Sequence, residues 1–164
     1  MLERLRPAAR LRWTKPENLH LTLKFIGEYP EGEMGTLEEA LRGVVWPGEF
    51  EVKVRGLGFF PNARAPRVIW AGVEAGPELG QLARRVDRAL WKLGVPPERK
   101  AYAPHLTLAR IEDRTPLSKL HEAIKALNSQ EFGVFRPDRF YLYWSQPGAG
   151  SSGYTRVREF RTTF

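Results

Sequence analysis

The sequence contains no cysteine and only three histidines among its 164 residues. Without cysteine the chain can form no disulfide, no thiolate metal site and no thiol nucleophile, which fits the reducing environment of a cytoplasm. The longest apolar runs, such as residues 68–71, are far shorter than the ~20 residues that a membrane-spanning helix needs. The N-terminal residues also lack the apolar stretch of a signal peptide. These absences predict a cytoplasmic protein without a membrane segment.

Acidic residues are in the minority among the charged ones. The 26 lysines and arginines exceed the 19 aspartates and glutamates, which gives a net charge of +7 and a pI of about 10.0. A basic surface favours a polyanionic partner such as nucleic acid, and the planar guanidinium of arginine fits phosphate oxygens well. A genome rich in arginine codons would give the same composition, so charge alone leaves the partner open.

The chain is too short for two comfortable domains, and we expect one domain over residues 1–164. Helices are predicted where apolar residues recur at helical spacing, at residues 34–45, 77–93 and 117–127. Strands are predicted at residues 19–26, 50–54, 67–73, 106–111, 132–135, 139–144 and 155–164, with a flexible turn at 146–153. Because strands and helices do not alternate strictly, the pattern favours an α+β fold of mainly antiparallel strands.

The most informative feature is a repeated tetrapeptide. Residues 20–23 read His-Leu-Thr-Leu, and the same four residues recur at 105–108. Side chains of a strand alternate between faces, so each histidine shares a face with its threonine while the leucines face the other way. Each leucine pair can anchor its strand in a core. If the two strands belong to related lobes, their polar side chains can converge on one cleft, namely His20, Thr22, His105 and Thr107.

Two histidines that face one phosphate suit acid–base catalysis. An unperturbed imidazole titrates at about pH 6.5, so one ring can be neutral while the other is charged. Opening a cyclic phosphodiester requires a water to lose a proton on one side of phosphorus and the departing sugar oxygen to gain one on the other. The threonine hydroxyls can donate hydrogen bonds to the non-bridging oxygens. A lone histidine is more often structural, and His121, which lacks such a context, is interpreted as a surface residue.

Metal binding is the alternative role for paired histidines. A zinc site usually takes three or four protein ligands. No His-x-x-x-His, cysteine pair or clustered aspartates accompany the repeat. The sequence therefore predicts neither a metal nor another cofactor.

At these residues the sequence resembles the two-histidine phosphoesterase superfamily, whose members carry paired His-x-Thr-x motifs. Within it, the chain is similar to the 2′-5′ RNA ligase family, the RNA 2′,3′-cyclic phosphodiesterases. The similarity runs over nearly the whole chain and includes residues around both motifs: Pro16 to Leu19, Phe25 to Glu28, Phe60-Pro61, Arg67 to Val73, Ala109-Arg110, Tyr143 to Ser145 and Tyr154.

This resemblance implies two pseudo-symmetric lobes of mainly antiparallel strands with flanking helices and an active-site cleft between the lobes. It implies an enzyme that hydrolyses RNA 2′,3′-cyclic phosphate ends to 2′-phosphates without a metal, with reversible 2′-5′ joining of RNA ends as a second activity. By the family's pattern, His20 is the proton donor and His105 the proton acceptor, although identical motifs cannot fix that polarity. The partner implied is RNA with a 2′,3′-cyclic phosphate end.

The residue five positions beyond each histidine differs between the motifs, because one is Phe25 and the other is Arg110. The resemblance implies that Phe25 stacks on a base and that Arg110, with Thr22 and Thr107, binds the substrate phosphate. Strict alternation places both on the leucine face, so each needs a strand end or a β-bulge to reach the cleft. Core packing is the alternative for Phe25, and Lys24 is interpreted as a solvated lysine.

One departure from the family concerns the N-terminus. Family members usually begin with a short apolar strand and a helix, whereas this chain starts at Met1 to Arg4, inside that helix. We therefore expect the N-terminal strand to be absent and a sheet edge to be exposed, with a monomer as the expected state. Two alternative functions stay open: a phosphodiesterase of a small cyclic nucleotide, and an RNA-binding module that has lost catalysis.

Overall fold

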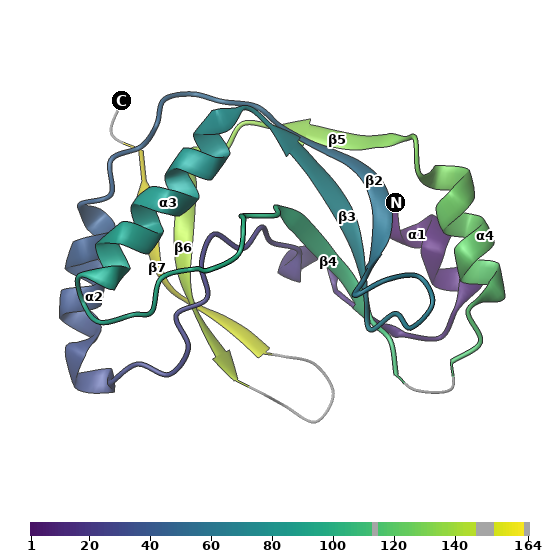
Figure 1. The fold of residues 1–164 in the computed structure, drawn as a ribbon, viewed down its shortest axis with the longest axis horizontal. Coiled ribbons are helices and arrows are strands. Elements are labelled where there is room, and N and C mark those ends of the chain that lie inside the picture. Colours follow the sequence, from purple (N-terminus) through teal and green to yellow (C-terminus); the bar gives the residue numbers. More distant parts are fainter. Residues whose placement is uncertain (113–114, 147–152, 163–164) are drawn as a thin grey trace.

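The computed structural model describes residues 1–112, 115–146 and 153–162, whose strands form two antiparallel sheets (Figure 1). The larger sheet has the order β1-β4-β3-β2-β5, and the smaller pairs β6 with β7. The strands are β1 (Arg12–Trp13), β2 (Val52–Phe60), β3 (Val68–Ala75), β4 (His105–Arg110), β5 (Glu131–Phe135), β6 (Arg139–Gln146) and β7 (Gly153–Arg161). The helices are α1 (Leu2–Leu5), α2 (Met34–Arg42), α3 (Pro77–Trp91) and α4 (Ser118–Leu127), and short 3-10 helices span Arg6–Ala8, Pro16–Asn18 and Glu31–Glu33.

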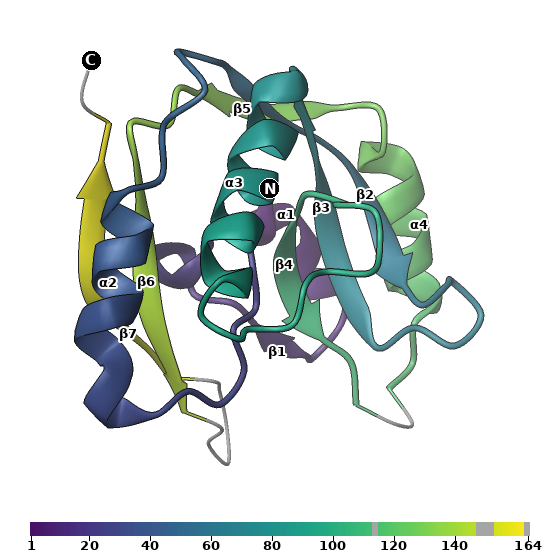
Figure 2. The ribbon, with the colours of Figure 1, turned by 60° about the vertical axis from the view of Figure 1, so that its left-hand side comes forward.

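The helices divide between the two sheets. α1 and α4 pack with β2, β3 and β4 in one apolar cluster, whereas α2 and α3 pack with Leu142 of β6 and Phe160 of β7 in a second. A third cluster joins β2 to α3 through Val52, Leu79 and Leu82. Figure 2 accordingly shows α3 between α2 and the larger sheet. The predicted α+β fold of antiparallel strands with flanking helices is confirmed.

α3 illustrates why these residues form these elements. Pro77 opens the helix in its first turn, where a missing N–H costs no hydrogen bond. Gly94 then follows the helix with a φ of 85°, a left-handed conformation, and the Val95 N–H donates to the Leu90 carbonyl at 3.2 Å. The predicted helix from Pro77, terminated at Gly94, is confirmed, and its buried stripe consists of Leu79, Leu82, Ala83, Val86 and Leu90.

Most other predicted elements are also present, with their ends shifted by a few residues. The helix that the family resemblance implies at the start of the chain is present as α1. Apolar periodicity alone predicts neither α1 nor β1, because segments of four and two residues are too short to show a period. The predicted turn at 146–153 falls largely on residues 147–152, which lie outside the described residues. Within the described part of the chain, no helix is long and apolar enough to cross a membrane.

The predicted strand at residues 19–26 is wrong. This segment makes one isolated β-bridge, between Leu21 and Leu106 of β4, and no ladder. The segment could form a ladder only along the edge of β4 that faces away from β3. β1 already pairs with the C-terminal end of that edge. The Thr14 N–H extends this pairing by donating to the Leu108 carbonyl at 2.8 Å. The first motif therefore meets β4 only near its N-terminal end.

Candidate active site

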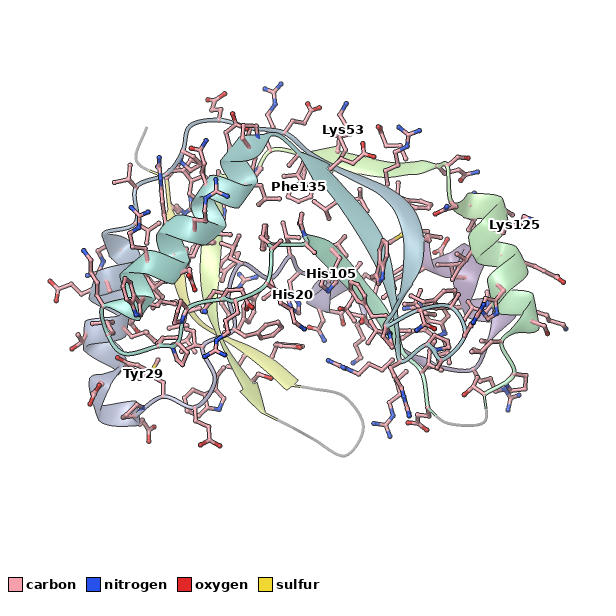
Figure 3. The ribbon with its side chains drawn as sticks, viewed as in Figure 1. His20, Tyr29, Lys53, His105, Lys125 and Phe135 are labelled. Carbon is pink, nitrogen blue, oxygen red and sulfur yellow. The ribbon has the colours of Figure 1, made fainter. Side chains whose placement is uncertain are left out.

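The two His-Leu-Thr-Leu motifs meet at their leucines. Leu21 and Leu106 form an antiparallel bridge, so each histidine lies opposite the threonine of the other motif. The two histidines and two threonines therefore share the face opposite to the bridging leucines, and diagonal neighbours across such a pair lie about 7–8 Å apart, with their Cβ atoms somewhat closer. Figure 3 shows His20 and His105 side by side between the two sheets. The spacing leaves room for one phosphate group.

The leucines of the two motifs are anchored in different parts of the core. Leu21 and Leu23 pack against the cluster that joins β2 to α3. Leu106 packs against the cluster beneath the larger sheet, and Leu108 is fully buried within it. The site thus lies where two separately packed regions come together.

Both histidines are held by the same backbone contact. Nδ1 of His20 lies 2.8 Å from the carbonyl oxygen of Asn18, and Nδ1 of His105 lies 2.8 Å from the carbonyl oxygen of Ala103. A carbonyl can only accept, so each Nδ1 carries the proton and donates it. Among the described residues no protein group is bonded to either Nε2. The neutral rings therefore each offer an Nε2 lone pair, and a protonated ring offers an Nε2–H donor.

A β-bulge in β4 determines where Arg110 lies. Three alternate residues of β3, which share one face, pair with His105, Thr107 and Arg110. Leu108 is the extra residue, and it is buried together with Ala109. Arg110 consequently lies on the face of His105 and Thr107, with its side chain exposed. Strict alternation would have placed Arg110 on the leucine face, and the β-bulge moves it to the face of the site.

Aromatic rings contact the two histidines, and they differ in chemistry. The His20 ring lies 4.7 Å from that of Tyr154 and 6.0 Å from that of Tyr143, between ring centroids. The His105 ring instead meets the ring of Phe60 edge-on, at 5.0 Å and an interplanar angle of 78°. The family resemblance includes these three aromatic residues but gives them no role. The structure thus places phenols beside one imidazole and an apolar ring beside the other.

Trp70 supports the apolar side of the site. Its ring lies 5.3 Å from the ring of Phe60 and occupies the space above Gly58, where any Cβ would overlap the indole. Gly58 is therefore required for close approach of the indole to β2. The Phe60–Trp70 pair packs behind the His105 ring.

Lys24 is not the solvated lysine that the sequence suggests. Its side chain is only 5% exposed and its Nζ lies 2.7 Å from Oδ1 of Asp87 and 2.7 Å from the Pro96 carbonyl. The Glu98 N–H also donates to Asp87, at 3.0 Å. Burial alone would raise the pKa of Asp87, but the hydrogen bonds from Lys24 and Glu98 and the lysine charge outweigh it and hold that pKa below its usual range. This network ties the first motif to α3 and to the loop that precedes the second.

Tyr102 makes a more direct link between the motifs. It lies three residues before His105, and its hydroxyl donates to the Thr22 carbonyl at 3.0 Å. Burial raises the pKa of Tyr102 well above its usual range, so the phenol stays protonated and remains a donor. No sequence signal marks this residue, because a single tyrosine in a coil segment has no readable pattern.

Two further assignments are decided by exposure and contacts. Phe25 is 73% exposed, which excludes the core-packing alternative. His121 is half-buried rather than a simple surface residue, because its two ring nitrogens lie 2.8 and 3.1 Å from the carbonyls of Leu117 and Ala63. Its ring also packs 4.9 Å from that of Phe59. Both nitrogens of His121 are therefore engaged in joining α4 to the loop after β2.

The donor set of the site fits a phosphate better than a metal ion. Within the described ranges, no three histidine, cysteine, aspartate or glutamate side chains come together as a metal site would need. The site face instead offers two imidazoles, two hydroxyls and a guanidinium. These are groups that donate hydrogen bonds to phosphate oxygens.

The fold of this protein is shared with proteins of known structure. The fold matches the crystal structure of TT0787 of Thermus thermophilus with a TM-score of 0.74 and 29% identity, covering 98% of this chain and 86% of that one. It also matches the crystal structure of a phosphoesterase with a TM-score of 0.72 and 26% identity, over 96% and 84% of the two chains. The class is therefore an α+β fold shared with a phosphoesterase.

Sequence comparison is more specific. The chain is 38% identical over 154 residues to the RNA 2′,3′-cyclic phosphodiesterase of Methanothermobacter thermautotrophicus. This alignment covers 93% of this chain and 83% of that relative. The sequence model of the 2′-5′ RNA ligase superfamily matches residues 2–149. The protein belongs to the 2′-5′ RNA ligase superfamily.

Proposed function

We propose that the protein hydrolyses the 2′,3′-cyclic phosphate at the 3′ end of an RNA to a 2′-phosphate, with His20 as proton donor and His105 as proton acceptor. The observation that carries the proposal is the matched pair of imidazoles, each with Nδ1 bonded to the backbone and Nε2 available on one face. Family membership supports the same substrate class, because the relative from Methanothermobacter is an RNA 2′,3′-cyclic phosphodiesterase.

In this mechanism the two rings act on opposite sides of phosphorus. Nε2 of His105 accepts a proton from a water whose oxygen attacks phosphorus. The bond between phosphorus and the 3′-oxygen breaks, and Nε2–H of His20 protonates that oxygen, so the phosphate stays on the 2′-oxygen. Each proton transfer contributes roughly 10²–10⁴ in rate. The scheme uses neither a metal nor another cofactor.

The remaining residues of the site face are assigned to the substrate. Thr22, Thr107 and Arg110 donate to the non-bridging oxygens as negative charge grows in the transition state, where a preorganised donor is worth up to about 3 kcal/mol. The β4 bulge supports this role for Arg110 by aligning it with Thr107. Phe25, with its exposed ring, is available to stack on a base of the RNA.

The same proposal covers the wider setting of the reaction. We expect residues 1–164 to act as a single bilobal domain, and the apolar cluster that joins β2 to α3 supports this. We further expect a cytoplasmic monomer with reversible 2′-5′ joining of RNA ends as a second activity. Gel filtration with light scattering tests the monomer, and incubation of two RNA fragments with cyclic and 5′-hydroxyl ends tests the joining.

The central test follows a synthetic RNA with a 2′,3′-cyclic end by ³¹P NMR. We expect a 2′-phosphate product, undiminished turnover in EDTA, and loss of turnover in His20→Ala and His105→Ala. His121→Ala is the matched control, since that histidine lies away from the site face, and thermal melting checks that each variant folds. Full turnover in both motif variants, or loss in EDTA restored by zinc, would contradict the proposal. Preference for a cyclic mononucleotide over RNA would favour the small-nucleotide alternative.

A further inference from the structure

The smaller sheet has two faces of different chemistry. One face carries Leu142, Phe160 and Phe140, which pack against α2 and α3. The register of β6 and β7 assigns the opposite face, because paired residues share a side. That face, called the hairpin face below, carries Arg139, Tyr141, Tyr143, Tyr154, Arg156 and Arg161. It includes the two tyrosines that contact His20, so it adjoins the candidate active site.

The hairpin face combines aromatic rings with positive charge. Tyr143 lies 6.3 Å from Tyr154 and 5.9 Å from Tyr141, between ring centroids. The guanidinium carbon of Arg156 lies 4.0 Å from the centroid of the Tyr141 ring. The rings therefore form a continuous row that begins at the imidazole of His20 and ends at an exposed arginine.

The charge of this face is also unbalanced. Glu159, paired with Tyr141 in the register, is the only carboxylate at these positions, and it is shared between Arg139 and Arg161. Asp138, next to the strand, also pairs with Arg139, at 2.7 Å. Arg156 remains stacked on Tyr141 and exposed, where a phosphate group can reach it.

The proposed reaction fixes the direction in which the RNA must leave the site. Water attacks on the His105 side and the 3′-oxygen departs on the His20 side, because entering and leaving groups lie on opposite sides of phosphorus. Both ring oxygens belong to the terminal ribose, with the 3′-oxygen opposite the attacking water and the 2′-oxygen beside it, so this ribose and the strand attached to it lie on the side away from that water. The nucleotides on the 5′ side of the cyclic phosphate therefore lie toward His20 and the hairpin face.

We infer that the hairpin face binds the RNA strand on the 5′ side of the cyclic phosphate, with tyrosine rings stacking on bases and Arg156 pairing with a backbone phosphate. The inference rests on the proposed function. Stacking on tyrosine tolerates any base, because every base has a π face, and a guanidinium recognises the phosphate common to all nucleotides. The face thus selects for the length of single-stranded RNA rather than for its sequence.

The test measures binding separately from catalysis. A fluorescein-labelled eight-nucleotide RNA that carries a 2′-phosphate at its 3′ end is titrated by fluorescence anisotropy against the wild type, Arg156→Ala and Tyr141→Ala. We expect Kd to rise about five- to tenfold in each variant, and the slope of log Kd against log salt to fall by about 0.7 in Arg156→Ala. Arg158→Ala is the matched control, because Arg158 lies on the same strand but pairs with Glu38 of α2 at 2.8 Å.

A second arm compares kcat/KM for a cyclic-ended octanucleotide and a cyclic mononucleotide. In the wild type the octanucleotide is favoured, and in Arg156→Ala the ratio of the two values falls about as much as the affinity does. An unchanged Kd and ratio in Arg156→Ala, or an equal loss in Arg158→Ala, would overturn the inference. Failure of the proposed function would appear differently, as absence of turnover on both substrates, and the binding arm would still decide the role of the hairpin face.

Discussion

The two identical tetrapeptides of this protein are held in place by different means. The second motif begins β4, which pairs with β3 along its length and with β1 at its C-terminal end. The first motif makes one bridge to β4 and is otherwise fixed by side chains. Lys24 joins it to Asp87 and Pro96, and Tyr102 joins it to the second motif.

The two motifs have the same sequence, but the second is held by more backbone pairing than the first. A strand with partners on both sides resists local opening through many backbone hydrogen bonds, whereas a segment with one bridge depends on a few side-chain contacts. We expect the position of His20 to be sensitive to distant substitutions that leave His105 unaffected.

The largest effects separate the chemical roles of the two histidines. We expect His20→Ala and His105→Ala each to lower kcat by roughly 10²–10⁴ on an RNA with a cyclic end. A substrate with sulfur at the 3′-bridging position needs no proton on its leaving group. It should restore much of the rate of His20→Ala and little of that of His105→Ala in steady-state assays. Equal restoration in both variants would contradict the donor and acceptor assignment.

The next effect concerns the support of the first motif. Lys24→Met leaves Asp87 partly buried without its cation, and we expect it to lower the free energy of unfolding by about 2–3 kcal/mol and to lower kcat as well. Urea denaturation measures the first quantity. Glu112→Gln is the control, because the side chains of Arg12 and Glu112 in its ion pair are 54% and 62% exposed and the pair should be worth less than about 1 kcal/mol. Equal losses in the two variants would remove the distinction.

A smaller effect tests the bulge in β4. Arg12 and Arg110 are paired across β1 and β4 and so share a face, but Arg12 is bonded to Glu112 at 2.6 Å. We expect Arg110→Ala to lower kcat/KM about 10–100-fold, as loss of a charge-assisted hydrogen bond does, and Arg12→Ala to change it less than about threefold. A larger loss in Arg12→Ala would reassign the phosphate contact.

The smallest effect is the pH dependence of the Lys24–Asp87 pair. The folded-state pKa of Asp87 is lowered, so its stabilisation is complete above the unfolded value of about 3.9 and is lost as the pH falls through the folded value. In thermal melts, the stability advantage of the wild type over Asp87→Asn should therefore shrink between about pH 5 and pH 2. An advantage that stays constant over this range would contradict the pairing.

Much of the fold could be predicted from the sequence because its helices and strands have readable periods. α3 has an apolar stripe, an opening proline and a terminating glycine, and all three signals act within a few residues of the backbone that they determine. The four polar residues of the repeated motifs were identifiable for a similar reason. Their face follows from local alternation, and only their convergence required the tertiary structure.

The errors arise where a distant segment decides the outcome. Residues 19–26 have the pattern of a strand, but β1 occupies much of the edge on which they would pair. Lys24 reads as solvated because its partner Asp87 lies 63 positions further along the chain. The bulge at Leu108 is set by the register with β3, and the sequence of β4 alone does not indicate it. The local sequence pattern of a segment does not show whether another segment occupies its sheet edge, or whether a distant residue forms a buried ion pair with it.

The matched Nδ1 contacts of His20 and His105 have a consequence for successive turnovers. Under the proposed assignment, hydrolysis starts with the proton on His20 and ends with it on His105. The free protein must therefore return this proton through solvent before it can repeat the same reaction. Until it does, His105 carries the proton and His20 does not, which is the protonation state that the reverse reaction requires. Slow proton exchange with solvent would therefore favour re-formation of the cyclic phosphate from the 2′-phosphate product.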